Sequence, residues 1–403
     1  MSLFTDSLDR LSWSRDIANI TDVRFQALHH PDMFVEVTIP VLMDDGATKF
    51  FTGFRCRYDS VRGPAKGGIR FHHGVNPHEV KSLAFWMMLK TALVDLPLGG
   101  GKGGVIVNAR ELSHGELERL SRGYVRALFD VLGPDTDVPA PDVATNPQVM
   151  SWMTQEYETI ARKKAAATFT GKPLSIGGIR GRNEATAAGS MRVIQNWLDH
   201  TSRGDAKLTV AVQGFGNAGA ILAGLLYDRG HKIVAVSDSR GAIYDPNGLD
   251  IPEVTATKAN EGRVSAYKGA ESIELDALLG LDVELLLPSA LENAITAENA
   301  DQIKAPLIAE VANGPISFDA EKILGERGVT ILPDILVNSG GVTVSWMEWM
   351  QNRSGDQWSA ARVAERLNQM LDDASAAVFE RASAEDVPVR MAAYAIAMER
   401  LQP

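Results

Sequence analysis

One segment near the middle of the chain places a strand, a glycine-rich turn and a helix in a fixed order, which limits the folds open to it. Residues 208–212 are apolar and long enough for a buried strand, and residues 214–219 read GFGNAG. A helical pattern then runs to Gly230, and a second apolar stretch covers 232–236. Because parallel strands need a crossover helix between them, this order predicts a doubly wound sheet.

The glycines of the turn have the spacing G-x-G-x-x-G, and their position between a strand and a helix makes the pattern specific. The first glycine permits a tight turn, the second lets a pyrophosphate approach the backbone, and the third lets helix and strand pack closely. Free N–H groups and the helix dipole favour phosphates at this helix N-terminus. We therefore predict a Rossmann-like dinucleotide site with contacts from Gly214, Phe215, Gly216, Asn217 and Ala218.

Asp238 ends the second strand of this unit, about 20 residues after the glycine-rich turn. A carboxylate at this position binds the ribose hydroxyls of NAD and repels the 2′-phosphate of NADP. Arg240, two residues further on, offers that phosphate a cation. We expect NAD as the cofactor, with NADP as the alternative.

The remaining patterns describe the rest of the sheet and a different region before it. Further apolar runs, expected as buried strands of the same parallel sheet, lie at 283–287, 306–309 and 329–332. Alternating apolar and polar residues at 35–41 and 48–58 flank a turn signal and predict a β-hairpin. Helical patterns at 79–95 and 115–132 make this earlier region mixed α and β.

The length of 403 residues exceeds the usual size of a single hydrophobic core, which favours two domains. We predict a mixed-sheet domain for substrate binding and oligomerisation over residues 1–178, followed by the dinucleotide-binding domain over 179–341. The pattern after Gly341 is helical through Leu401. We expect residues 342–403 to pack back on the first domain.

Composition and charge argue against several classes of protein. The net charge of −11 argues against a nucleic-acid partner, because binding to phosphates needs clustered positive charge. Neither a stretch of about 20 apolar residues nor the apolar core of a secretory signal is present. The single cysteine, Cys56, cannot form an intrachain disulfide and is typical of a reducing compartment. We expect a cytoplasmic enzyme without a bound metal.

Lys90 lies on an apolar helical stripe with Leu83, Met87 and Val94. An unpaired ammonium is costly to bury, so this lysine needs an anionic partner unless its head group reaches water. Two more lysines lie among glycines, Lys66 in the sequence GPAKGG and Lys102 in the sequence GGGKGG. We interpret both as lying in loops that a substrate can approach. Burial among other cations lowers the pKa of a lysine and suits it to proton transfer.

Taken together, these residues resemble the glutamate, leucine, phenylalanine and valine dehydrogenases, and most closely the small hexameric glutamate dehydrogenases. The similar blocks lie at 63–71, 90–105, 137–150, 177–189, 210–219, 309–315 and 332–349. The resemblance implies reversible oxidation of L-glutamate to 2-oxoglutarate and ammonia, with hydride transfer to NAD(P). It also implies a homohexamer.

The resemblance also implies roles for individual side chains. Lys102 is similar to the catalytic lysine that polarises the C2 oxygen and activates water, and Asp142 to the aspartate that relays protons to and from the amino nitrogen. Lys90 resembles the lysine that binds the α-carboxylate, whereas Lys66 and Ser345 resemble the pair that binds the side-chain carboxylate. Positions that match cofactor-facing residues of the family are Thr186, Asn217, Asn313 and Asn338.

Two alternatives remain open from the sequence. One is a dehydrogenase for leucine, phenylalanine or valine, although an apolar substrate would leave Lys66 without an anion. The other is a catalytically silent paralogue that binds NAD, although Lys102 and Asp142 are both present. The chain departs from the family pattern at Ala187 and Val311, beside the expected cofactor. We expect these departures to affect cofactor affinity more than chemistry.

Overall fold

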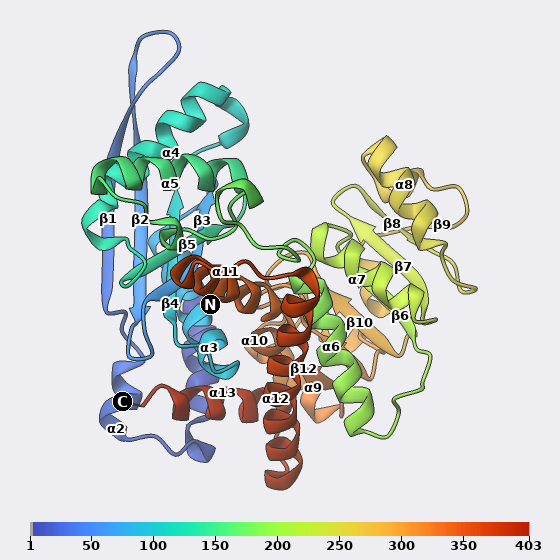
Figure 1. The fold of residues 1–403 in the computed structure, drawn as a ribbon. Helices are drawn as coiled ribbons and strands as arrows, with labels where there is room; N and C mark the ends of the chain where they lie inside the picture. Colours follow the sequence, from blue (N-terminus) through green and yellow to red (C-terminus); the bar gives the residue numbers. More distant parts are fainter. Residues whose placement is uncertain (1–2, 403) are drawn as a thin grey trace. The chain divides into compact units, whose positions relative to one another are not determined.

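The computed structural model describes residues 3–402, which divide into two compact units. The first unit contains the residues up to Arg182, together with Val342–Arg366 and the residues from Ala395 onward. The second unit contains Asn183–Gly341 and Leu367–Tyr394. Both units combine helices with a mixed sheet, so the predicted mixed α/β class is confirmed (Figure 1).

The first unit is built on a five-stranded sheet with the order β1-β2-β4-β3-β5. Its strands are β1 (Met33–Leu42), β2 (Thr48–Asp59), β3 (Ala65–Phe71), β4 (Gly99–Val105) and β5 (Asp137–Pro141). Strands β1 and β2 form the predicted antiparallel hairpin, and β2 also pairs antiparallel with β4. Strand β3 pairs in parallel with β4 and with β5, which makes the sheet mixed.

The glycine-rich segments around Lys66 and Lys102 are strands β3 and β4, so the prediction of loops there is wrong. Their glycines are needed for close packing. A Cβ atom added at Gly67 would lie 1.4 Å from the carbonyl oxygen of Gly101, and one added at Gly100 would lie 2.4 Å from that of Ala84. Glycine therefore lets neighbouring backbones approach each other while the two lysines are held rigidly.

Helices cover both faces of this sheet. The helices of the first unit are α1 (Leu3–Trp13), α2 (Asp22–Ala27), α3 (Pro77–Leu93), α4 (His114–Leu128) and α5 (Pro147–Ala161). Helix α3 packs on the face that bears Gly100, because a Cβ atom there would meet Ala84 and Met88. Gly103, on the opposite face, lies against Tyr124 of α4. Side chains of α4 and α5 complete an apolar core with Ile39, Phe71 and other strand residues.

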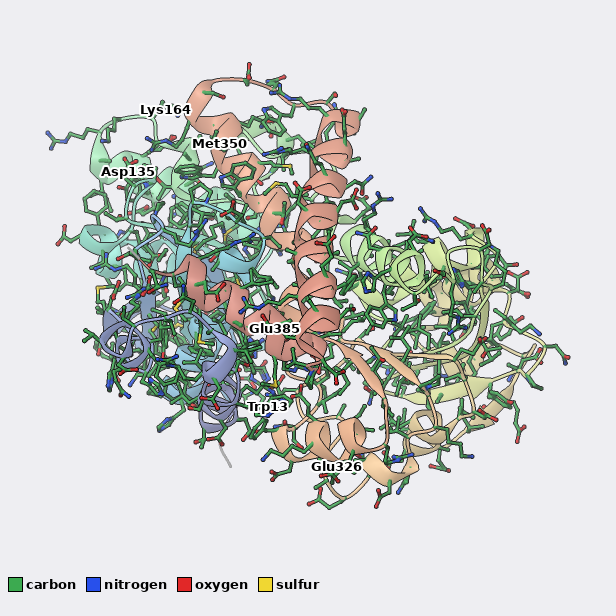
Figure 2. The ribbon with its side chains drawn as sticks, turned by 90° about the horizontal axis from the view of Figure 1, so that it is seen from below. Trp13, Asp135, Lys164, Glu326, Met350 and Glu385 are labelled. Carbon is green, nitrogen blue, oxygen red and sulfur yellow. The ribbon has the colours of Figure 1, made fainter. Side chains whose placement is uncertain are left out.

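Most of helix α11 (Gly340–Ser354) belongs to the first unit. Its Trp349 donates a hydrogen bond from Nε1 to the carbonyl oxygen of Pro134 at 2.9 Å, and Arg353 forms an ion pair with Asp135. Asp135 and the nearby Met350 are labelled in Figure 2. These contacts tie the helix that bears Ser345 to the turn before β5.

The second unit contains a seven-stranded sheet with the order β12-β11-β10-β6-β7-β8-β9. Its strands are β6 (Thr209–Gln213), β7 (Lys232–Asp238), β8 (Gly241–Tyr244), β9 (Glu271–Ile273), β10 (Leu285–Pro288), β11 (Leu307–Ala309) and β12 (Thr330–Leu332). The pairs from β12 through β7 are parallel, as predicted. Strands β8 and β9 are antiparallel and were not predicted. Since only two residues connect β7 to β8, the two strands must run in opposite directions.

Helices of the second unit are α6 (Ala185–His200), α7 (Asn217–Asp228), α8 (Ile251–Glu261), α9 (Phe318–Glu326) and α10 (Asp334–Val337), with most of α12 (Ala360–Glu385). Helix α13 (Val389–Arg400) contributes residues to both units. The predicted unit β6-α7-β7 is present.

The C-terminal helices differ from the prediction that residues 342–403 all pack on the first domain. Leu367–Tyr394 belongs to the second unit. Asp372 of α12 forms an ion pair with Arg192 of α6 at 2.5 Å, and Arg390 forms an ion pair with Glu310 at 2.7 Å. Such charge pairs over long sequence separations cannot be read from helical periodicity. Within residues 3–402, no helix is both long and apolar enough to span a membrane.

Candidate functional site

Two of the predicted site lysines lie on the same face of the first unit's sheet. Lys66 of β3 is paired in register with Gly100 of β4, and Lys102 lies two residues further along β4. Side chains alternate between the faces of a strand, so Lys66 and Lys102 project to the side covered by α3. The strand spacings place their Cα atoms about 8 Å apart. Because both are only a few per cent exposed, the sheet presents two buried cations side by side.

Lys102 forms an ion pair with Asp142, which directly follows β5. Burial lowers the pKa of Lys102, the Asp142 carboxylate opposes that effect, and the cation of Arg70 adds to it. Burial acts to raise the pKa of Asp142, but the cations of Lys102 and Arg70 outweigh it and hold that pKa well below its usual range. The structure thus brings the predicted catalytic pair into contact.

Lys66 lies within a second group of charges. Burial, followed by the cations of Arg182 and Arg55, lowers its pKa well below the ordinary value for lysine. Arg55 forms a buried ion pair with Asp137, whereas Nε of Arg182 is buried without a hydrogen-bond partner among the described residues. Arg182 was not predicted from the sequence, although it lies within the similar block at 177–189. It adds a second positive charge next to Lys66.

Ser345 of α11 lies beside a buried polar cluster that was also missed. Its hydroxyl is 2.6 Å from that of Thr170. One helical turn further on, Glu348 pairs with Lys172 at 2.8 Å, and both side chains are fully buried. Glu348 Oε2 also accepts a hydrogen bond from the backbone N–H of Gly171 at 2.8 Å. Because Lys172 already pairs with Glu348, that carboxylate cannot fully compensate the cations of Lys66 and Arg182.

Lys90 is buried in the last turn of α3, on the helix that covers the lysine-bearing face. Its low exposure of 6% goes against the alternative in which its head group reaches bulk water. The described contacts do not place Lys90 beside Lys102, so its role toward an α-carboxylate stays a prediction.

The glycine-rich turn of the second unit has the geometry that a pyrophosphate requires. Gly214 has φ of +101°, and a Cβ atom added at Gly219 would lie 2.0 Å from the carbonyl oxygen of Gly214. A Cβ atom added at Gly216 would have no neighbour within 4 Å, so the space above this residue is open. Gly216 is also the N-cap of α7, where no side chain bonds to the first N–H groups. These features fit a bound dinucleotide.

Asp238 lies at the end of β7, as predicted, but its carboxylate already has protein partners. It accepts hydrogen bonds from the backbone N–H groups of Arg240 and Val264, each at 2.8 Å. Lys258 of α8, which was not predicted, lies 3.4 Å from the same carboxylate and also bonds to the carbonyl oxygen of Phe215. Lys258 therefore offsets part of the negative charge expected to exclude NADP.

Two other predicted cofactor residues contact each other in the second unit. Nδ2 of Asn338 donates to Oδ1 of Asn313 at 3.0 Å and to the carbonyl oxygen of Val311 at 3.1 Å. Oδ1 of Asn338 is buried and has no hydrogen-bond partner in the described chain, which leaves an acceptor for a ligand amide. Thr186 lies in the first turn of α6. The two departures, Ala187 and Val311, have buried side chains.

Comparisons with known proteins agree with this geometry. Residues 31–159 match the family model described as Glu/Leu/Phe/Val dehydrogenase, dimerisation domain, and residues 177–403 match the model for Glutamate/Leucine/Phenylalanine/Valine dehydrogenase. The NADP-specific glutamate dehydrogenase of Synechocystis sp. is 48% identical, over 99% of this chain and 96% of the relative. The catabolic NAD-specific glutamate dehydrogenase RocG of Bacillus subtilis is 43% identical, over 98% of this chain and 91% of the relative.

Solved structures show the same similarity. The hetero-hexameric glutamate dehydrogenase from Thermus thermophilus, in its leucine-bound form, is 35% identical with a TM-score of 0.94, and covers 99% of this chain and 95% of its own. Glutamate dehydrogenase from Peptoniphilus asaccharolyticus is 38% identical with a TM-score of 0.86, and covers 100% of this chain and 98% of its own. The chain belongs to the glutamate/leucine/phenylalanine/valine dehydrogenase family.

Proposed function

We propose that this chain catalyses the reversible oxidation of L-glutamate to 2-oxoglutarate and ammonia, with hydride transfer to NAD(P). The observation that carries the choice of substrate is the pair of basic side chains Lys66 and Arg182, of which Lys66 is buried and Arg182 partly buried, and whose pKa values are both lowered chiefly because burial disfavours their charged forms. Glu348, a nearby carboxylate, already pairs with Lys172. Buried charges need compensation, so a substrate with an anionic side chain fits this site better than one with an apolar side chain.

Each residue of the first unit's site has a separate role in the reaction. Lys66, Arg182 and Ser345 bind the side-chain carboxylate of glutamate, and Lys90 binds its α-carboxylate. A nicotinamide held by the second unit would supply the acceptor for the hydride from the α-carbon, and the substrate would then carry an iminium. Lys102, whose pKa is lowered chiefly by burial, accepts a proton from the water that attacks this iminium. Asp142 then relays protons to the nitrogen until ammonia leaves.

The dinucleotide site is assigned to the glycine-rich turn 214–219 and its neighbours. Gly214 to Ala218 face the pyrophosphate, Asp238 binds the ribose hydroxyls, and Asn313 and Asn338 bind near the nicotinamide with Thr186. Relatives described as NADP-specific and as NAD-specific both match this chain at 43% to 48% identity. We propose NAD as the preferred cofactor because Asp238 is present at the end of β7, and Lys258 weakens this preference.

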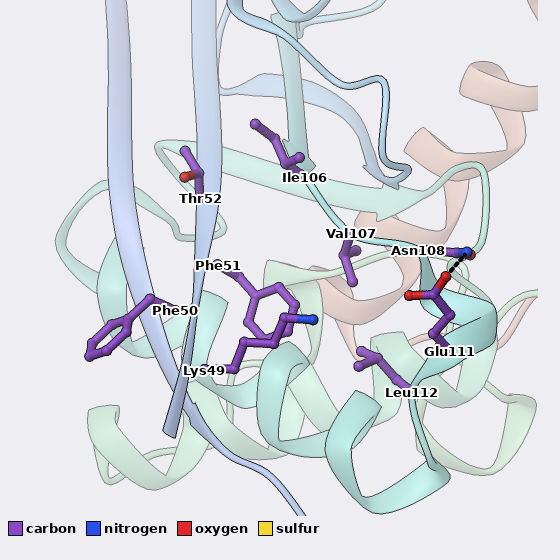
Figure 3. A pocket seen from close by; sticks show the side chains of 9 residues that line it. All are labelled: Lys49, Phe50, Phe51, Thr52, Ile106, Val107, Asn108, Glu111 and Leu112. Atoms are coloured by element: carbon purple, nitrogen blue, oxygen red, sulfur yellow. Dashed lines mark hydrogen bonds between the residues drawn. The ribbon is translucent and has the colours of Figure 1, made fainter. Parts of the chain in front are cut away.

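We further propose a homo-oligomer, a hexamer by similarity, formed through the first unit. Strand β1 is the edge of its sheet, so one side of its backbone has no strand partner within the described chain. Next to the hairpin, a pocket of about 210 Å³ lies between β2 and the segment 106–112 (Figure 3). Phe50, which lines this pocket, is 67% exposed. An unpaired strand edge beside an exposed aromatic side chain fits contact with another copy of the chain.

No nucleic acid or membrane is assigned as a partner, and we place the enzyme in the cytoplasm. The net charge of −11 supports the absence of a nucleic-acid partner. Cys56, the single cysteine, is free and buried, as is typical of a reducing compartment.

Initial rates with glutamate, leucine, phenylalanine and valine, each with NAD and with NADP, test the proposal directly. We expect glutamate to have the highest kcat/KM. A higher kcat/KM for leucine, phenylalanine or valine would overturn the choice of substrate. Failure to form NADH or NADPH from any amino acid would favour the silent paralogue.

A further inference from the structure

Arg70 lies next to the proposed catalytic pair, Lys102 and Asp142, and has no role in the reaction proposed for them. It is on β3, four residues after Lys66 and therefore on the same face of the sheet. Its Nε donates a hydrogen bond to Oδ1 of Asp142 at 3.0 Å. Its guanidinium also forms an ion pair with Glu79. Arg70 thus connects the first turn of α3 to the aspartate.

The two oxygens of Asp142 have different partners. Oδ1 accepts hydrogen bonds from Nε of Arg70 and from the backbone N–H of Val143, the latter at 2.6 Å. Oδ2 contacts the ammonium of Lys102. The backbone N–H of Asp142 itself donates to Oγ1 of Thr145 at 2.7 Å. Oδ1 is therefore held by Arg70 and the backbone, and Oδ2 faces Lys102.

Glu79 keeps the guanidinium in a fixed orientation. Its backbone N–H is capped by the side chain of Asn76, so Glu79 itself is held in the first turn of α3, where a carboxylate also interacts favourably with the helix dipole. The side chains of Arg70 and Glu79 are 18% and 15% exposed, so water screens their interaction only partly. An arginine held at both ends presents its Nε in one direction.

Arg70 also changes the proton affinity of both members of the pair. Its positive charge disfavours the ammonium form of Lys102 and favours the ionised form of Asp142. Accordingly, Arg70 contributes to lowering the pKa of Lys102, after burial, and it adds to the effect of Lys102 in lowering the pKa of Asp142. The second effect favours the ionised form of Asp142.

We propose that Arg70, held by Glu79, is a positioning residue that fixes Oδ1 of Asp142 and so makes Oδ2 the oxygen that exchanges protons with the substrate nitrogen. This inference rests on the proposed function, because it assumes that Asp142 relays protons and that Lys102 acts as a base. Arg70 acts through Asp142 and Lys102 and does not itself need to touch the substrate.

The test compares Arg70→Gln and Arg70→Lys with the matched control Arg62→Gln in the complete enzyme. Arg62 has the same 18% side-chain exposure as Arg70 and pairs with Asp95. Each variant is measured for kcat and KM with glutamate, for the pH profile of kcat/KM, and for its melting temperature.

Arg70→Gln should lower kcat by about 10-fold to 100-fold with a small change in the KM for glutamate. Without the cation, the pKa of Lys102 rises, so the acid limb of the pH profile should move to higher pH. Arg70→Lys keeps the charge but cannot bridge two carboxylates, so it should keep the limb near its original pH and recover kcat only in part. Arg62→Gln should change neither kcat nor the pH of the acid limb.

A kcat for Arg70→Gln within about threefold of the original, with an unmoved acid limb, would overturn the inference. Equal losses of kcat in Arg70→Gln and Arg62→Gln, in step with melting temperature, would also overturn it by showing a purely structural role. Failure of the proposed function has a different signature, because the unsubstituted enzyme would then prefer another amino acid or form no NADH or NADPH from any of them. If Arg70→Gln does not fold, Arg70→Lys still decides the question through its kcat and its pH profile.

Discussion

Both units bury groups of charged side chains, but the balance of charge differs between them. In the first unit, Lys66 is a buried cation and Arg182 a partly buried one, and the carboxylate of Glu348 near them is already paired with Lys172. In the second unit, the buried cation of Arg390 is surrounded by several carboxylates.

The carboxylates around Arg390 are those of Glu310, Glu321 and Asp334, all nearly inaccessible to solvent. This group satisfies Arg390 internally and raises its pKa well above the ordinary value, even though burial alone acts to lower it. The difference teaches that burial of charge alone does not identify a binding site. A buried cation whose nearby carboxylate is already paired with another cation indicates one, because a ligand must supply the missing negative charge.

The largest effect should come from the catalytic pair. Lys102→Ala and Asp142→Asn should each lower kcat by about 10³-fold or more, since proton transfer then lacks its base or its relay. Binding of NADH, measured by fluorescence titration, should stay nearly unchanged because both residues belong to the first unit. A loss of NADH affinity in step with kcat would mean that this pair has a structural role.

The cluster of the second unit, in which one cation contacts three carboxylates, should respond differently from the first. Arg390→Met leaves three buried carboxylates without their cation, and we expect the free energy of unfolding to fall by about 3 to 5 kcal/mol. Denaturant unfolding measures this loss. Arg381→Met is the matched control, since Arg381 lies in the same unit and forms an i,i+4 pair with the partly exposed Glu385. Similar unfolding free energies for the two variants would contradict the proposed difference between the units.

The charge surplus of the first unit should appear in substrate choice. Lys66→Leu removes an ammonium that contributes about 2 to 3 kcal/mol through charged hydrogen bonds. The kcat/KM for glutamate should therefore fall by roughly 30-fold to more than 100-fold. Activity on norleucine, methionine or leucine should rise relative to glutamate, because those side chains no longer leave a buried charge uncompensated.

Arg182→Leu should change the kcat/KM for glutamate in the same direction as Lys66→Leu if both cations bind the distal carboxylate. Lys164→Leu serves as the control, since its side chain is 93% exposed. If the kcat/KM of Lys66→Leu for glutamate stays within about threefold of the original value, Lys66 does not bind the distal carboxylate. The enzyme would then be an amino-acid dehydrogenase of undetermined substrate.

The sequence predicted features that depend on neighbours along the chain. The glycine spacing of 214–219, the hairpin β1-β2 and the strand-helix-strand order are all local patterns, and the structure confirms them. The loops expected around Lys66 and Lys102 are strands, because their glycines serve close packing between backbones. That packing is set by residues from other elements and leaves no local signal.

The ion pairs between residues far apart in the sequence could not be predicted from the sequence. Glu348 pairs with Lys172 across 176 positions, and Arg182 becomes notable only once it lies near Lys66. Lys258 approaches Asp238 only because α8 packs beside the end of β7. The family resemblance implied roles for Lys102 and Asp142 as separate positions, and the fold alone places them in contact.

The smallest expected effect concerns the cofactor. Asp238→Ser removes the carboxylate that repels a 2′-phosphate, and it leaves Lys258 and Arg240 as cations near the ribose. We expect the ratio of kcat/KM for NAD to that for NADP to fall by about 10-fold, or about 1.4 kcal/mol. Steady-state rates with both cofactors at one glutamate concentration measure this ratio.

Lys258→Met should move the same ratio in the opposite direction, because Asp238 then repels the 2′-phosphate without a compensating cation at 3.4 Å. Asp238 also bonds to the backbone N–H groups of Arg240 and Val264, so Asp238→Ser must be checked for a lower melting temperature. A drop in melting temperature with an unchanged cofactor ratio would show that Asp238 serves to hold the β7-β8 turn. The determinant of cofactor choice would then lie elsewhere in the second unit, with Arg240 and Lys258 as the next residues to substitute.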